Sequence, residues 1–273
     1  LLVPLIILSF GKWQYVFILS VVLSASWLII WLLVYKPANQ SRFVNKKELD
    51  YIQSDQDDFE KEKIPWKNLV RYRQTWAVAL GKMFADPVWY FYLFWGAKFL
   101  NAKFGVELKG LALPLVIIYV IAYAGGIAGG AVSSRFLKKG MSVNYARKRT
   151  MFGTALLVLP VMTVPFINSM YVCVGLIALA AAAHNSWSAN IFTVASDLFP
   201  KKMVGSVIGF STTISSIAAM GTALLIGYAL NEGGTKGYVF PFVIAAFGYL
   251  IGLLMIHLLS PRMQPVSIQN REK

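Results

Sequence analysis

The sequence predicts an all-α, polytopic membrane protein whose helices form a bundle. Two observations lead to this fold class. Of the 273 residues, 57% are apolar and only 14% are charged, whereas soluble domains average about 45–50% apolar and about 25% charged residues. The apolar residues also gather in runs of about 20, the length that an α-helix needs to cross a bilayer core about 30 Å thick. We therefore expect the lipid bilayer to be a partner of this chain.

Helices rather than strands are expected in these runs. Inside hydrocarbon, each backbone N–H and C=O group has to be bonded within its own helix or in a closed barrel. The runs are long and continuously apolar, without the alternation that barrel strands show. The pattern predicts the end of one span at 1–10 and seven complete spans, at 14–35, 75–97, 111–134, 150–168, 171–195, 204–230 and 239–260.

The basic residues indicate how the chain is oriented. The formal net charge is +14, but the basic residues flank the spans, so no nucleic-acid partner is expected. Twenty Lys and Arg residues fall on one side of the membrane and five on the other. Because loops rich in Lys and Arg stay in the cytoplasm, we expect a multi-pass protein with a cytoplasmic C-terminus.

One long polar stretch, 36–74, divides the chain and is expected to be a solvated cytoplasmic linker. Residues 1–35 before it are expected to be the last one and a half helices of an N-terminal bundle. After it we expect a complete six-helix bundle at 75–260 and a cytoplasmic tail at 261–273. The chain opens inside an apolar run at Leu1, which fits neither a natural N-terminus nor a signal peptide. This arrangement predicts a fragment of a twelve-helix transporter made of two six-helix bundles.

A basic loop after the third complete span carries the first recognisable motif. Residues 129–140 read GGAVSSRFLKKG, and residues 146–149 read ARKR. Small residues permit close helix contact, and cations suit the carbonyl-rich end of a helix. The segment resembles the loop that follows the second helix of each half in the major facilitator superfamily, where the usual pattern is GxxxDRxGRR. Ser134 takes the place of the Asp, and a plain basic loop is the alternative interpretation.

Two runs carry a narrower resemblance: WAVALGKMFADPVWYFYLFW at 76–95 and AHNSWSANIFTVASDLFPKK at 183–202. They are similar to the hexuronate transporter branch of the anion:cation symporter family, within the major facilitator superfamily. The resemblance implies uptake of sugar acids, such as glucuronate or galacturonate, with protons across the inner membrane by alternating access. It also implies that the Arg anchoring the substrate carboxylate and the acids that carry protons lie on early helices, outside this sequence. We expect a monomer with no enzyme activity and no cofactor other than protons as the coupling ion.

The span at 75–97 holds two charges. Lys82 and Asp86 lie four residues apart, so they share a helix face and can neutralise each other. An isolated charge at that depth costs about 2.5–3.5 kcal/mol, which predicts either a polar cavity wall or a paired structural charge beside Pro87. Tyr90 lies on the face of Asp86 and offers a ring and a hydroxyl to a sugar. The neighbouring aromatic residues are expected to pack instead: Trp89, Tyr92 and Trp95.

The span at 171–195 is unusually polar. Asn185 and Ser188 share one helical stripe with Phe192, and Asn190 lies on a neighbouring stripe. Amides and hydroxyls can hydrogen-bond a carboxylated sugar, but they also join transmembrane helices. Both interpretations are open for these three polar residues. The predicted substrate contacts are therefore Asp86, Tyr90, Asn185, Ser188 and Asn190, with Lys82 as the partner of Asp86.

Other titratable residues receive structural interpretations. His184 lies in mid-span and changes charge near neutral pH, but no carboxylate shares its helix face, so packing is favoured over a proton relay. Asp197 is expected in a cytoplasmic loop, as an anchor near Lys201 and Lys202. The sequence shows no residues at metal-binding spacing. Two other functions are kept as alternatives: a major facilitator transporter of another small solute, and a seven-helix receptor or scaffold.

Overall fold

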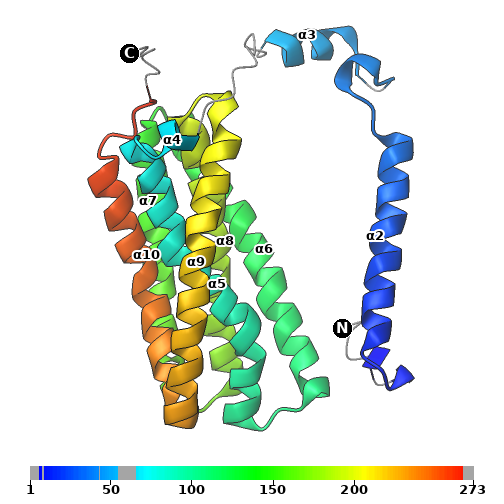
Figure 1. Cartoon of the computed structure of the whole chain (residues 1–273), viewed down its shortest axis with the longest axis vertical. Helices are drawn as coiled ribbons and strands as arrows, with labels where there is room; N and C mark the ends of the chain where they lie inside the picture. The colour runs from blue at the N-terminus through cyan, green and yellow to red at the C-terminus, as the bar shows by residue number, and fades with distance from the viewer. Residues whose placement is uncertain (1–5, 8, 43, 55–65, 267–273) are drawn as a thin grey trace. The chain divides into compact units, whose positions relative to one another are not determined.

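The chain folds into helices, which confirms the expected all-α class (Figure 1). Its contacts divide it into two compact units, 1–63 and 64–273. Parts of the expected linker and tail, 55–65 and 267–273, lie outside the described residues. The computed structural model describes residues 6, 7, 9–42, 44–54 and 66–266.

The first unit contains one long apolar helix, α2 (Gln14–Val34). None of its residues is buried within the unit, and it is apolar all round, as expected for a helix whose surroundings are lipid. Its 21 residues give a length of about 30 Å, which matches a bilayer core. The described part of this unit also holds η1 (Ala38–Gln40) and α3 (Lys46–Ser54).

The second unit is a bundle of six long helices that run alternately in opposite directions (Figure 1). This alternation brings the start of α5, α7 and α9 to the same end of the bundle as the finish of α6, α8 and α10. The closest neighbours are α6 with α8, and α5 with both α9 and α10. Its described elements are α4 (Trp66–Leu69), α5 (Arg73–Phe104), α6 (Leu108–Lys138), α7 (Val143–Val158), η2 (Leu159–Phe166), α8 (Met170–Leu198), α9 (Lys201–Gly233), η3 (Gly234–Tyr238) and α10 (Val239–Leu259).

The span expected at 150–168 differs from the structure at both ends. Its helix, α7, already begins at Val143, and α-helical geometry gives way to the 3₁₀ segment η2 before Pro160. Proline has no N–H group to donate, and its ring excludes the carbonyl four residues earlier. The ammonium of Lys103 donates to the carbonyls of Val164 and Pro165, at 3.1 and 2.7 Å, and so satisfies the end of η2.

Five helical segments of the described chain are long and apolar enough to cross a membrane. Helix α5 is expected to span as well but is not among them, because its charged and Tyr- and Trp-rich sequence lowers its mean hydropathy. The five segments are α2, Gly110–Lys138, Val143–Phe166, α8, and Lys201–Leu259, which holds α9, η3 and α10.

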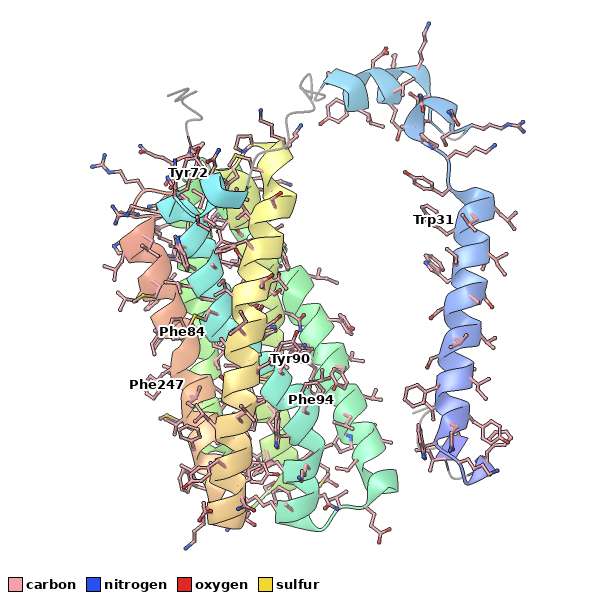
Figure 2. The ribbon with its side chains drawn as sticks, in the orientation of Figure 1. Trp31, Tyr72, Phe84, Tyr90, Phe94 and Phe247 are labelled. Atoms are coloured by element: carbon pink, nitrogen blue, oxygen red, sulfur yellow. The ribbon has the colours of Figure 1, made fainter. Side chains whose placement is uncertain are left out.

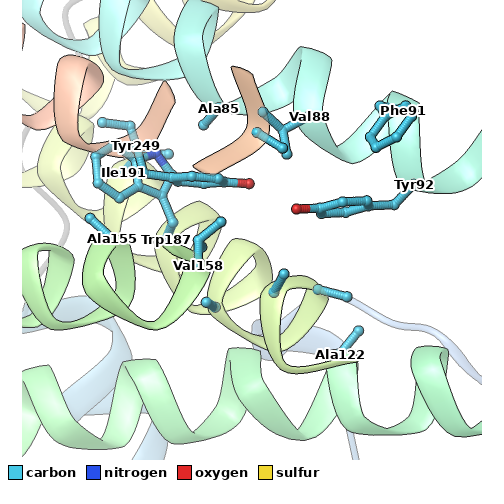
Figure 3. Close-up of a cluster of buried hydrophobic side chains, with 14 of the residues drawn as sticks. Ala85, Val88, Phe91, Tyr92, Ala122, Ala155, Val158, Trp187, Ile191 and Tyr249 are labelled. Carbon is cyan, nitrogen blue, oxygen red and sulfur yellow. The ribbon is translucent and has the colours of Figure 1, made fainter. Parts of the chain in front are cut away.

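Small residues allow α6 and α8 to approach closely. A methyl group at Gly129 would stand 2.7 Å from the Cα atom of Ser186, and one at Gly125 would overlap Ala182. The close helix contact expected from the small residues at 129–140 is thus present at Gly129, and Gly125 extends it, whereas Gly130 faces open space. Figure 3 shows the adjoining core, where side chains from α5, α6, α7, α8 and α10 meet around Trp187 and Tyr249.

Candidate functional site

The predicted pairing of Lys82 and Asp86 is present in the middle of α5. The Nζ atom of Lys82 lies 3.0 Å from Oδ2 of Asp86. The Lys82 side chain is 6% exposed and that of Asp86 is 19% exposed, so the carboxylate is the more accessible member. An ion pair this far from water persists because each charge lowers the cost of burying the other.

Two residues that sequence reasoning did not assign to the site complete this cluster. The hydroxyl of Ser215 on α9 donates to Oδ2 of Asp86 at 2.7 Å, and the ammonium of Lys82 lies 4.8 Å from the ring centre of Phe192 on α8. A cation over an aromatic face is attracted by the ring. The only sequence signal for Ser215 is the group of hydroxyl residues at 211–213, 215 and 216 in an otherwise apolar helix. We call Lys82, Asp86, Phe192 and Ser215 the charged cluster.

A groove lies beside the charged cluster, between α5 and α9. Its volume is about 280 Å³. Pro87 and Ser216 line it and directly follow Asp86 and Ser215 in sequence, whereas no member of the charged cluster lines it. The remaining lining residues are Tyr90, Phe91, Phe94, Trp95, Ala219, Met220, Thr222, Ala223 and Ile226.

Tyr90 is exposed to this groove, as a substrate contact requires. Its ring stacks on that of Phe94, with centres 6.0 Å apart and planes 8° from parallel. Figure 2 labels both residues on α5. Tyr92, in contrast, is buried, and its hydroxyl has no hydrogen-bond partner among the described residues. The two neighbouring tyrosines therefore occupy different environments, one open and one packed.

His184 is held by aromatic rings, which agrees with the packing interpretation. Trp89 stacks on the imidazole with centres 5.0 Å apart and planes 9° from parallel. Its Nδ1 atom lies 2.8 Å from the hydroxyl of Tyr249 on α10. The residue is 5% exposed. In Figure 3 the hydroxyls of Tyr249 and Tyr92 point toward each other within the core.

The three polar residues predicted on α8 lie in different surroundings. Asn190 is fully buried and its amide donates to the carbonyls of Ser186, at 2.9 Å, and Gly129 on α6, at 3.4 Å. That geometry favours the helix-joining alternative for Asn190. Asn185 is half-buried and bonds its own helix at Ala181, at 3.2 Å. Ser188 is half-buried as well, so Asn185 and Ser188 stay predicted contacts.

Asp197 differs from its expected position and partner. It lies in the last turn of α8, and its Oδ2 atom accepts from Nε of Arg147 at 2.8 Å. The same guanidinium donates to Oγ of Ser133 at 2.7 Å. Arg147 thus joins α6, α7 and α8 at the basic end of the bundle. The sequence suggested Lys201 and Lys202 as neighbours of Asp197, whereas the ion pair in the structure is formed with Arg147.

The sequence matches the family model of the Major Facilitator Superfamily over residues 1–223 and 137–273. The chain belongs to the Major Facilitator Superfamily. The resemblance inferred from the basic loop and the two motif runs is therefore confirmed at the level of the superfamily.

Several curated superfamily members are similar to the chain. It is 30% identical to the hexuronate transporter of Escherichia coli (strain K12), over 90% of this chain and 57% of that protein. It is 26% identical to the D-galactonate transporter of Escherichia coli O6:H1, over 90% of this chain and 60% of that protein. It is 30% identical to the galacturonate transporter of Dickeya chrysanthemi, over 62% of this chain and 51% of that protein. The chain thus spans somewhat more than half the length of these relatives.

A solved structure confirms the expected major facilitator fold. The chain resembles a bacterial homologue of the human lysosomal transporter Spinster, solved in an inward-facing and unoccupied conformation. The TM-score is 0.60 at 16% identity, over 89% of this chain and 58% of that one. In the present chain, the charged cluster contains the ammonium of Lys82, whose partner is the more accessible carboxylate of Asp86. A groove walled by aromatic rings lies between the same two helices, α5 and α9.

Proposed function

We propose that this chain is part of a secondary active transporter that takes up sugar acids, such as hexuronates, together with protons. Superfamily membership and the relatives' names support this proposal. The observation that carries it is the charged cluster beside an aromatic groove, because a carboxylated sugar needs both a cation and a flat apolar wall. Since the chain covers 57% of the hexuronate transporter, the activity belongs to the whole protein.

In this proposal Lys82 exchanges partners during binding. The substrate carboxylate approaches from the groove and takes the place of Asp86 beside the ammonium, while Ser215 keeps its hydrogen bond to Asp86. The exchange is favourable only if the incoming anion is held as well as the carboxylate that it replaces, which selects for acids over neutral sugars. The ring and hydroxyl of Tyr90, and the half-buried Asn185 and Ser188, then contact the sugar.

The membrane arrangement is part of the same proposal. The twenty basic residues on one side, against five on the other, support a cytoplasmic C-terminus in a multi-pass inner-membrane protein. Two helical bundles rock about the central site, which opens to each side in turn. The protein works as a monomer, and the proton gradient drives uptake.

Uptake by cells tests the function. The gene of the whole protein that includes this chain is expressed in bacteria that lack their own hexuronate uptake, and entry of radiolabelled glucuronate is measured. We expect entry that a protonophore abolishes and that galacturonate inhibits more strongly than glucose does. Equal inhibition by glucose, or a preference for a peptide or drug, would favour transport of another solute. Entry that survives the protonophore would contradict proton coupling, and the absence of any uptake would favour a receptor or scaffold.

Two tyrosines that lie two residues apart on α5, Tyr90 and Tyr92, test the site itself. Tyr90→Phe removes a hydroxyl that faces the groove, so we expect the KM for glucuronate to rise about 2- to 10-fold, the worth of one hydrogen bond. Tyr92→Phe makes the same chemical change at a buried hydroxyl without a described partner, and KM should stay unchanged. An equal rise in both variants would show that the effect does not come from the groove.

A further inference from the structure

A second groove lies at the basic end of the bundle, between α7 and α10. Its volume is about 720 Å³, within the range of about 300–1,000 Å³ that is typical of small-molecule sites. It is separate from the groove beside the charged cluster, which is formed by α5 and α9. Its lining residues are Asn144, Tyr145, Lys148, Arg149, Phe152, Leu250, Leu253, Leu254 and His257.

The two cations of this groove have no acidic partner in the described chain. Lys148 donates to the carbonyls of Ser260 and Pro261, at 2.8 and 2.6 Å, and its Nζ atom lies 3.2 Å from Nδ1 of His257. These contacts hold the ammonium in place but carry no negative charge. Arg149 is bonded to a tyrosine hydroxyl, and neither of the two ion pairs among the described residues includes Lys148 or Arg149.

Arg149 is exposed and oriented by aromatic rings. Its guanidinium carbon lies 5.3 Å from the ring centre of Tyr145 and 5.9 Å from that of Phe136. One N–H group of the guanidinium is bonded to the hydroxyl of Tyr145, and the others keep the fork geometry that suits a phosphate. Asn144 lines the same groove, but its side-chain oxygen is buried and does not face it. The groove therefore has an unmatched positive charge.

The rest of the groove is apolar and lies further from the basic end of the bundle. Phe152 is one turn further along α7, and Leu250 and Leu254 lie one turn apart on α10. Phe152 and Leu254 are 48% and 51% exposed. A ligand that fills the whole groove has to combine an anionic, hydrogen-bonding head with an apolar tail.

We propose that this groove binds an anionic glycerophospholipid, with phosphatidylglycerol as the best match. Its phosphate binds the free N–H groups of Arg149 and is also attracted by the charge of Lys148, and an acyl chain lies along Phe152 and Leu254. Basic pockets between membrane helices recognise anionic head groups in this way. The proposal concerns the lipid-facing side of α7 and α10, so it does not depend on the nature of the transported solute.

Native mass spectrometry tests this site on the purified chain, released from vesicles that contain equal amounts of phosphatidylglycerol and phosphatidylethanolamine with the same acyl chains. We expect phosphatidylglycerol to be the main bound lipid. One basic residue near the membrane contributes about 1 kcal/mol, so Arg149→Gln should lower the ratio of phosphatidylglycerol to phosphatidylethanolamine about fivefold. Leu254→Trp, which fills the apolar half, should reduce the amounts of both lipids retained.

The matched control is Lys202→Gln. It removes one exposed cation at the start of α9, at the same end of the bundle but outside the groove, and the lipid ratio should not change. An equal fall in Lys202→Gln would show that only the general surface charge attracts the lipid. No preference for phosphatidylglycerol in the unaltered chain, or a mass for two copies without lipid, would overturn the proposal.

Discussion

The pair formed by Lys82 and Asp86 permits a direct separation of stability from transport. Asp86→Asn leaves the ammonium of Lys82, which is 6% exposed, without a carboxylate. Breaking a buried pair from one side costs about 3–5 kcal/mol. Lys82→Met leaves a carboxylate that is 19% exposed and still bonded to Ser215, so we expect a loss near the lower end of that range. Replacing both residues leaves no unpaired charge and should be within about 1 kcal/mol of the parent chain.

A double-mutant cycle measures this coupling. The free energy of unfolding in mixed detergent micelles is determined for the parent chain, Lys82→Met, Asp86→Asn and the double variant. The expected coupling is about 3 kcal/mol or more, because the two single losses do not add. Losses that add within about 0.5 kcal/mol would refute the assignment of a coupled pair.

Transport by the whole protein with the same substitutions distinguishes the two interpretations of the pair. If Lys82 receives the substrate carboxylate, glucuronate uptake is lost in the single variants and stays lost in the double variant, although stability has returned. If the pair is only a structural charge beside Pro87, uptake recovers together with stability. Recovery of uptake would therefore remove Lys82 and Asp86 from the substrate site.

Three further changes test the packing around the site. Gly129→Ala should lower the free energy of unfolding by about 1–3 kcal/mol, because the new methyl group overlaps Ser186, whereas Gly130→Ala, which faces open space, should change it by less than about 0.5 kcal/mol. Arg147→Lys should destabilise the bundle by about 1–3 kcal/mol in the same assay, because a lysine cannot reproduce the guanidinium's two directed bonds; no change would show that these bonds contribute little. Tyr249→Phe removes the hydrogen bond to His184 and should cost about 1–3 kcal/mol in thermal or detergent unfolding, and a loss no greater than that of Tyr92→Phe would contradict this.

Local signals in the sequence were enough to predict the helices and the main charge pair. Apolar runs determine spans because lipid leaves the backbone no other partner, and four residues form about one helical turn, which places Lys82 beside Asp86. Contacts between helices were not accessible in the same way. Ser215 lies on another helix from Asp86, and Arg147 reaches Asp197 across the bundle, so each pairing depends on how whole helices pack. Nearness in sequence, which favoured Lys201 and Lys202, gave no sign of Arg147.

The polar residues of α5 and α8 divide into two groups once packing is known, and the division narrows the search for the site. Asn190 bonds α6 and is fully buried, so a solute could reach it only if α6 and α8 separated, and the close approach at Gly129 opposes that. Asp86 bonds a hydroxyl on α9 but is still partly exposed, so it can exchange partners without any helix moving apart. Because a site that binds and releases a solute in each cycle has to exchange partners at low cost, the charged cluster meets this requirement and the contact between α6 and α8 does not.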